Sequence, residues 1–178
     1  IIPSEETKLN MYPMDYEEFR WAMGDAATVP LLRSAFEKKM SLGDATHRKL
    51  MRDFRLYMLV GGMPQAVAAY IKTNNFTAVD LVKRDIIALY EEDFSKFDNS
   101  GRAKAMYDAI PAQLNKNAMR YQVGKVIPDE RAERIINVVK DMEDSMTANV
   151  AFRSDDPNVG LALTKNLEYF KMYTSDTG

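Results

Sequence analysis

The stretch that decides the fold is "LYMLVGGMPQAVAAY", residues 56–70. Two apolar runs meet there at Gly61-Gly62, and Pro64 opens the second run. Glycine ends a helix readily because it adopts a positive φ without the clash that a side chain would cause. Proline suits the first turn of the next helix because its ring fixes φ and that turn needs no backbone donor. The stretch therefore predicts two helices joined by a tight corner.

Helices are also expected before this corner. Asp15 and Glu18 form a capping-box pattern before a helix that Gly24 ends. Pro30 is expected at the first position of a second helix. A third helix is expected over residues 45–60. The apolar stripe of the second helix consists of Leu32, Phe36 and Met40. The expected inward residues of the third helix are Leu50, Phe54, Tyr57 and Met58.

After the corner, a short helix is expected over residues 65–71, and Thr77 is expected to cap a long helix that follows. The long helix has the clearest periodicity in the chain. Its stripe consists of Val79, Val82, Ile86, Leu89, Tyr90, Asp93 and Phe97. The turn-forming sequence "DNSG", residues 98–101, predicts a linker after it.

The pattern changes after this linker. "RAKAMYDAIPAQLN" predicts a helix with Pro111 near its end, and "MRYQVGKVIP" predicts a short helix or strand. A helix capped by Asp129 is expected next, followed by strands at "NVAF" and "EYFKMY". This is the order of a winged helix-turn-helix. The buried residues expected in the capped helix are Ala132, Ile135, Ile136, Val139 and Met142.

The fold class expected from these patterns is mainly α: a helical, lid-type bundle followed by a winged helix-turn-helix-like segment with a short β-hairpin. The expected divisions are residues 1–28 for a linker and the helix that leads into the bundle, 29–98 for the bundle, and 102–178 for the winged-helix-like segment.

Composition limits the function. The 178 residues are 46% hydrophobic and carry a net charge of -2, so they can bury a core but have no overall field that attracts nucleic acid or anionic membranes. Cysteine is absent, which excludes disulfides and thiolate chemistry and fits a cytoplasmic protein. No apolar run approaches the roughly 20 residues of a membrane span.

No catalytic or metal site is predicted. His47 is the only histidine, and its position near a helix start favours a solvated surface group. The sequence contains no G-x-x-x-x-G-K-[ST] phosphate loop, no G-x-S-x-G elbow and no H-E-x-x-H motif. Acidic pairs such as Glu91/Glu92 fit solvated helix faces, because adjacent carboxylates on a helix point about 100 degrees apart.

The glycine corner has two interpretations on physical grounds. It is a tight helix–helix connection without a function, or its bare backbone and the flat ring of Pro64 form a surface that a small ligand approaches. In the second case one side of the corner is exposed.

The ordered set "MYPMDYEEF", "LYMLVGGMPQAV", "VKRDIIALYEEDF" and "YTSDTG" resembles a family of prokaryotic AAA-superfamily P-loop ATPases. The resemblance covers nearly the whole chain. These proteins have an ATPase core, a helical lid, a winged-helix segment and a C-terminal domain. The resemblance implies that this chain is the lid and winged-helix piece of a longer protein, called the parent ATPase below. It also implies that Gly61, Gly62 and Pro64 lie against the adenine, and that Arg84 belongs to the basic-acidic pair "RD" of the long lid helix.

The departure from this family is the missing phosphate loop and the missing magnesium-binding strand. The resemblance therefore implies ATP as a cofactor of the parent ATPase, no cofactor and no ATPase activity in this chain alone, and the parent's own core and C-terminal domain as partners. The lid module would couple nucleotide state to the C-terminal domain.

The alternative is a stand-alone helical DNA-binding or protein-interaction adaptor. The expected recognition helix, residues 129–145, carries more acidic than basic residues, which disfavours DNA because a helix in the major groove faces phosphates. Lys116, Arg120, Lys125 and Arg153 are the cations nearby. A phosphate loop encoded upstream would support the ATPase module, and a start codon there would support the adaptor.

Overall fold

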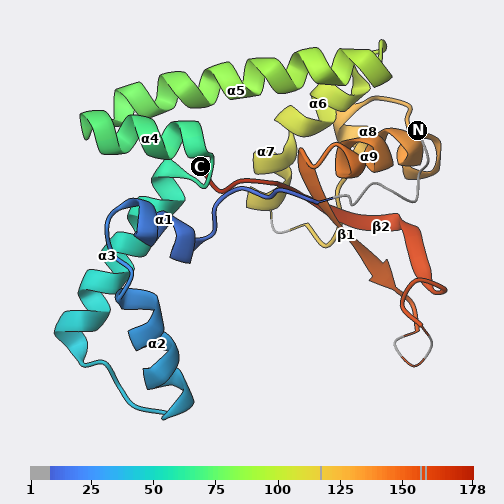
Figure 1. Cartoon of the computed structure of the whole chain (residues 1–178). Helices are drawn as coiled ribbons and strands as arrows, with labels where there is room; N and C mark the ends of the chain where they lie inside the picture. The colour runs from blue at the N-terminus through green and yellow to red at the C-terminus, as the bar shows by residue number, and fades with distance from the viewer. Residues whose placement is uncertain (1–8, 117, 157, 159) are drawn as a thin grey trace, which may run out of the picture. The chain divides into compact units, whose positions relative to one another are not determined.

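The computed structural model describes residues 9–116, 118–156, 158 and 160–178. The chain is mainly helical and carries an antiparallel β-hairpin near its C-terminus, as the sequence predicts (Figure 1). It divides into two compact units. The first unit comprises residues up to Val82 together with Asp176–Gly178, and the second comprises Lys83–Ser175.

The division lies inside the long helix α5 (Phe76–Phe97), whereas the sequence placed a domain boundary at the "DNSG" linker. The reason is that α5 supplies side chains to two separate cores. Val79 belongs to the buried cluster of the first unit, and Phe94 to that of the second. A helix that contributes to both cores cannot belong to only one of them, and the linker after it is a turn within the second unit.

The first unit contains α1 (Tyr16–Ala22), α2 (Thr28–Glu37), α3 (Asp44–Val60), α4 (Pro64–Thr73) and the start of α5. Its core consists of Phe19, Val60, Ala66, Val67 and Val79. The expected capping box is present at α1, where Asp15 accepts a hydrogen bond from the backbone of Glu18 and the Glu18 side chain accepts one in return.

The expected starts of two helices in this unit are wrong. Pro30 is the third residue of α2, not the first, because Asp25 accepts hydrogen bonds from the N–H groups of Ala27 and Thr28 and so starts the helix earlier. Thr77 does not cap α5, since the helix begins at Phe76 and Asn75 accepts a hydrogen bond from the backbone of Thr77.

The stripe expected on α2 is not a core. No residue of α2, all of which the structure describes, is buried, and Phe36 is 86% exposed. In α3, Val60 is the residue that is fully buried, whereas Phe54 and Met58 remain partly exposed. The periodicity therefore gives the helices correctly but does not decide which apolar faces the chain itself covers.

The second unit contains α6 (Arg102–Asp108), α7 (Ile110–Asn115), α8 (Val123–Val126), α9 (Ala132–Asp144), β1 (Ala148–Ser154) and β2 (Lys165–Thr174). Four helices followed by a hairpin are similar to the order expected for a winged helix-turn-helix, with the first of the expected helices divided into α6 and α7. The single helix expected over 102–115 is divided, because Pro111 has no N–H to continue a helix from α6 and instead lies in the first turn of α7.

Asp129 does not cap α9, contrary to expectation. Its φ is 64°, so it lies in the turn before the helix, and α9 begins three residues later at Ala132. The buried face of α9 consists of Ile135, Val138, Val139 and Met142. These residues pack with Phe94, Met106, Ile110, Phe170 and Met172 in the core of the second unit.

Candidate functional site

The glycine corner has the local geometry that the sequence predicts. Helix α3 ends at Val60, Gly61 has φ 85° and ψ −178°, and Pro64 is the first residue of α4. The Gly61 conformation is one that glycine alone adopts without strain. The backbone N–H of Gly61 also donates to the carbonyl of Tyr57, which closes the last turn of α3.

Gly62 is bonded to two segments that are distant from it in the sequence. Its carbonyl accepts a hydrogen bond of 2.7 Å from the N–H of Met14. Its own N–H donates 2.6 Å to Oδ1 of Asp176. We call this set, Met14, Gly62 and Asp176, the corner clasp. All three residues belong to the first unit.

Both glycines are needed because neighbouring atoms occupy the space of a side chain. A Cβ on Gly61 would lie 2.3 Å from Oδ2 of Asp176, and a Cβ on Gly62 would lie 2.2 Å from the carbonyl oxygen of Met14. Gly61 and Gly62 are buried, whereas Pro64 and Gln65 are exposed. The expectation of bare glycine backbone on an open side is therefore wrong, and the open part of the corner is the proline and the residue after it.

Tyr57 supports the clasp from α3. Its hydroxyl donates 2.9 Å to the carbonyl of Met14, and its ring packs against Phe19 with centroids 5.4 Å apart. Burial raises the pKa of Tyr57, and the carboxylate charges of Asp176 and Asp15 raise it further. A neutral phenol that donates a hydrogen bond is thereby maintained beside the corner.

Three of the four predicted binding residues are gathered at this corner: Gly61, Gly62 and Pro64. Arg84 is an exposed residue of α5 and part of the second unit. Sequence reasoning gave Tyr57 as an inward residue and quoted Met14 and Asp176 within family motifs, but it did not place any of the three at the corner. Their role there depends on hydrogen bonds that span as many as 114 residues.

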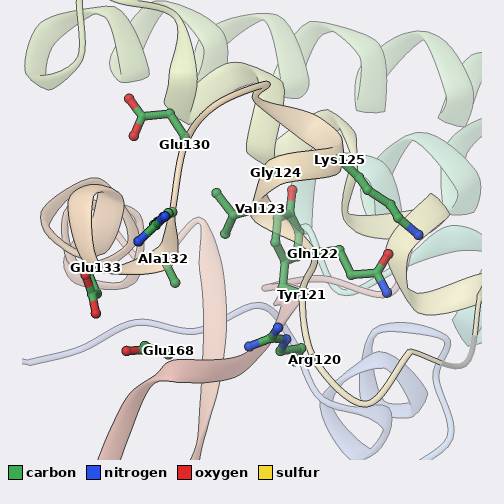
Figure 2. Close-up of a pocket in the computed structure, with 11 residues that line it drawn as sticks. Arg120, Tyr121, Gln122, Val123, Gly124, Lys125, Glu130, Ala132, Glu133 and Glu168 are labelled. Atoms are coloured by element: carbon green, nitrogen blue, oxygen red, sulfur yellow. The ribbon is translucent and has the colours of Figure 1, made fainter.

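The second unit contains a cavity of about 610 Å³ at the start of α9 (Figure 2). It is lined by Arg120, Tyr121, Gln122, Val123, Gly124, Lys125, Glu130, Arg131, Ala132, Glu133 and Glu168. Sequence reasoning named Arg120 and Lys125 as cations near α9. It counted Glu130 and Glu133 among the acidic residues of the expected recognition helix, but it did not place them, or Glu168, at a cavity.

The charges around this cavity are mixed. Glu133 and Glu168 lie close together at one side of it in Figure 2, and the hydrogen bond with Glu133 raises the pKa of Glu168. Glu130 lies 3.6 Å from a guanidinium nitrogen of Arg102. Arginine, lysine and glutamate side chains all line the opening, and no single ligand charge is favoured.

The outer face of α9 is not basic. Its exposed side chains are Glu133, Arg134, Asn137, Lys140, Asp141 and Asp144. Three of these are acidic and two basic, so this face would meet a phosphate backbone with net repulsion. The observed surface of the helix thus agrees with the charge argument made from its sequence.

Among the described residues, no group of three or more His, Cys, Asp or Glu side chains is arranged to hold a metal ion. No helix in the described part of the chain is long and apolar enough to cross a membrane. His47 is exposed and lies beside Phe36 and Met40 at a shallow apolar depression.

Comparison with known proteins gives one family. A family model described as "Domain of unknown function (DUF8612)" matches residues 51–178. The match begins in α3 and includes the glycine corner, α5 and the whole of the second unit. No curated protein matches the chain, and no solved structure matches it.

Proposed function

This chain belongs to the family described as Domain of unknown function (DUF8612), and we propose that it is the lid and winged-helix module of an AAA-superfamily ATPase. In this proposal the ATPase core and the C-terminal effector domain are other parts of the parent ATPase. The module does not catalyse a reaction. It couples the nucleotide state of the core to the effector domain through the glycine corner.

The observation that carries the proposal is the corner clasp. Gly62 is bonded through its carbonyl to Met14, which precedes the first helix, and through its N–H to Asp176, which follows β2. The same residue therefore holds the segment that leads into the lid and the segment that leaves the winged helix. A shift of the corner of a few tenths of an ångström would strain both bonds.

Such an arrangement provides a physical route for coupling. A ligand changes a conformational equilibrium only through contacts that differ between the two states. If nucleotide contact at Pro64 differs between states, the clasp transmits that difference to the chain after β2, toward the effector domain. Coupling of this kind is reciprocal. If nucleotide binding changes the free energy of the contact at Asp176, the same contact changes the free energy of nucleotide binding by an equal amount.

The residues present fit part of an adenine site. The Pro64 ring and the Gln65 side chain are exposed and adjacent, so an apolar face and an amide are available to a purine. The backbone N–H of Gly62 already donates to Asp176, so it is not available to a ligand. The corner therefore offers a ligand the Pro64 ring but not the backbone amide of Gly62. The 178 residues include no phosphate loop, so phosphates and magnesium would be held by the parent's core.

The test is the nucleotide affinity of the parent ATPase carrying Pro64→Ala. Alanine is compatible with a first helical turn, so the fold should lose only about 1 kcal/mol through unfolded-state entropy. Nucleotide affinity should fall by more than this, because the ring surface is lost. Pro30→Ala is the matched control, since Pro30 is exposed in the first turns of α2 and lies away from the corner.

Hydrogen exchange supplies a second readout. Protection of the Gly62 amide against hydrogen exchange should change when an ATP analogue binds the parent ATPase. This amide donates one of the two hydrogen bonds of the clasp. Equal affinities for Pro64→Ala and Pro30→Ala, with no change in exchange at Gly62, would show that the corner is architectural only. The isolated chain should release no phosphate from ATP above a buffer blank.

A further inference from the structure

One face of the β-hairpin contributes no residue to the core that the described residues of the second unit form. Pairing of β1 with β2 places Ala148, Val150, Phe152, Phe170 and Met172 toward the buried cluster. The alternate residues point away from that cluster. We call them, together with Arg120, the hairpin outer face: Asn149, Ala151, Arg153, Tyr169, Lys171, Tyr173 and Arg120.

Arg120 is fixed to this face by the residue that follows it. The N–H of Tyr121 donates 2.7 Å to the carbonyl of Phe170, so residues 120–121 run along the edge of β2. The Tyr121 ring stacks on Phe170 with centroids 5.9 Å apart, and its hydroxyl donates 2.7 Å to the carbonyl of Met106. Figure 2 shows Arg120 and Tyr121 on this segment, beside the cavity.

Two arginines contact one tyrosine ring. The guanidinium carbon of Arg120 lies 4.4 Å from the centroid of Tyr169, and that of Arg153 lies 5.3 Å from it. Packing against the ring orients each guanidinium while its N–H groups remain able to donate. The hairpin outer face therefore presents an aromatic ring flanked by donors of the type that recognise phosphate.

Aromatic and cationic side chains also alternate along β2 on the rest of this face. Lys171 lies between Tyr169 and Tyr173 on the strand, and four residues of strand rise separate the two tyrosine backbone positions by about 13 Å. Tyr173 is 40% exposed. On β1 the residues opposite Lys171 and Tyr173 are Ala151 and Asn149.

We propose that the hairpin outer face binds single-stranded nucleic acid, with bases stacked on Tyr169 and Tyr173 and the phosphate backbone on Arg120, Arg153 and Lys171. Alternating aromatic and cationic side chains on a sheet are the combination that binds a single strand without sequence preference. An acidic protein would be met by the cations but would make no use of the two rings. A duplex would hide its bases from them.

The acidic side chains near this face are compatible with the proposal. Asp155 forms an ion pair of 2.9 Å with Arg153, but both side chains are at least half exposed, so a phosphate can replace the carboxylate at little cost. Glu133 of α9 and Glu168 of β2 line the same cavity as Arg120, so the Arg120 end of the face is the less favourable end for a phosphate. Asp141 and Asp144, the other acidic residues of the outer face of α9, do not line that cavity. This site is independent of the glycine corner, so its test does not depend on the ATPase proposal.

The experiment is fluorescence anisotropy of a labelled 20-nucleotide oligodeoxythymidylate titrated with the 178-residue chain at several salt concentrations. Binding in the micromolar range is expected at low salt, with affinity falling as salt rises. Tyr169→Ala should weaken binding about 5- to 100-fold, as expected for the loss of one stacked base, and Tyr169→Phe should restore it. Circular dichroism melts establish that each variant is folded.

A charge-reversal pair separates this face from α9. Arg153→Glu should weaken binding at least tenfold and make the salt dependence shallower, whereas Arg134→Glu on the outer face of α9 should change affinity less than twofold. Both residues are exposed. Arg153→Glu also tests the proposal if Tyr169→Ala does not fold.

Three results would overturn the proposal. One is the absence of binding to the oligonucleotide at low salt. Another is that Tyr169→Ala binds the oligonucleotide as tightly as the unmodified chain and that heparin displaces the oligonucleotide completely. Binding would then depend on charge alone, with no contribution from the ring. The last is that a 20-base-pair duplex binds more tightly than the single strand and that Arg134→Glu abolishes this, which would assign binding to α9.

Discussion

The backbone N–H of Gly62 donates a hydrogen bond of 2.6 Å to Oδ1 of Asp176, a residue 114 positions away in the sequence. The carboxylate follows the last strand of the second unit, yet Asp176 belongs to the first. This bond and the one from Met14 to Gly62 close the corner on both sides.

Asp176→Ala removes the acceptor of a buried amide. We expect the free energy of unfolding to fall by about 1–3 kcal/mol, because the N–H of Gly62 is left without its partner in a buried position. Urea denaturation of the 178-residue chain measures this. Asp144→Ala at the exposed end of α9 is the control and should change stability by less than about 0.5 kcal/mol. Equal effects would mean that the clasp adds no stability.

Gly61→Ala tests the space at the corner separately from its backbone conformation. Gly61 and Gly43 both lie in the region that glycine alone favours, with φ 85° and 76°. A Cβ on Gly61 would meet Asp176, whereas one on Gly43 would have no atom of the described residues within 4 Å. Gly61→Ala should therefore lose about 1–3 kcal/mol more than Gly43→Ala in thermal or urea unfolding. A similar loss in both would leave backbone strain as the whole cause.

Arg20 is a buried cation between two carboxylates. Its guanidinium pairs with Asp25 and lies 3.0 Å from Asp53, and its side chain is only 10% exposed. Arg20→Ala would leave Asp25 and Asp53 without their shared partner, so we expect a loss of about 3–5 kcal/mol. Arg33→Ala is the control. Arg33 pairs with Glu17 but is 65% exposed, so its removal should cost less than about 1 kcal/mol.

Asp25 should make the first unit sensitive to acid. Hydrogen bonds from the Thr28 hydroxyl, from Arg20 and from backbone N–H groups hold the pKa of Asp25 well below its ordinary value. Its stabilising contribution is therefore complete above the unfolded-state pKa of about 3.9 and is lost as the pH falls below it. Asp25→Asn should flatten the decline of stability between about pH 5 and pH 2, measured by urea denaturation at each pH.

Asp98 holds the turn that joins α5 to α6. Its Oδ2 accepts 2.7 Å from the N–H of Ala103, and its Oδ1 accepts hydrogen bonds from Ser100. Burial by itself would raise the pKa of Asp98, but these bonds and the nearby Arg102 outweigh burial and lower it. Asp98→Ala should lose about 1–3 kcal/mol, as for a buried donor left without its acceptor. Asp93→Ala, at a half-exposed residue of α5, should lose much less.

The sequence alone determined the features that depend on local chemistry. The conformational freedom of Gly61, the fixed φ of Pro64 and the capping box of Asp15 and Glu18 act within a few residues. Helix ends at these places were therefore predictable, and so were the long α5 and the hairpin, whose apolar periods of 3.6 and 2 are continuous. The mixed charge of the outer face of α9 was likewise visible in its residues.

Only the tertiary structure decided which of these elements meet. Asp176 reaches Gly62 across 114 residues, α5 contributes to two cores, and the apolar stripe of α2 stays exposed. Arg120 lies on Tyr169 because Tyr121 is bonded to Phe170. Periodicity shows that a face is apolar but does not show what covers it. Hydrogen bonds between distant segments leave no local pattern in the sequence, because they form only once the chain has folded.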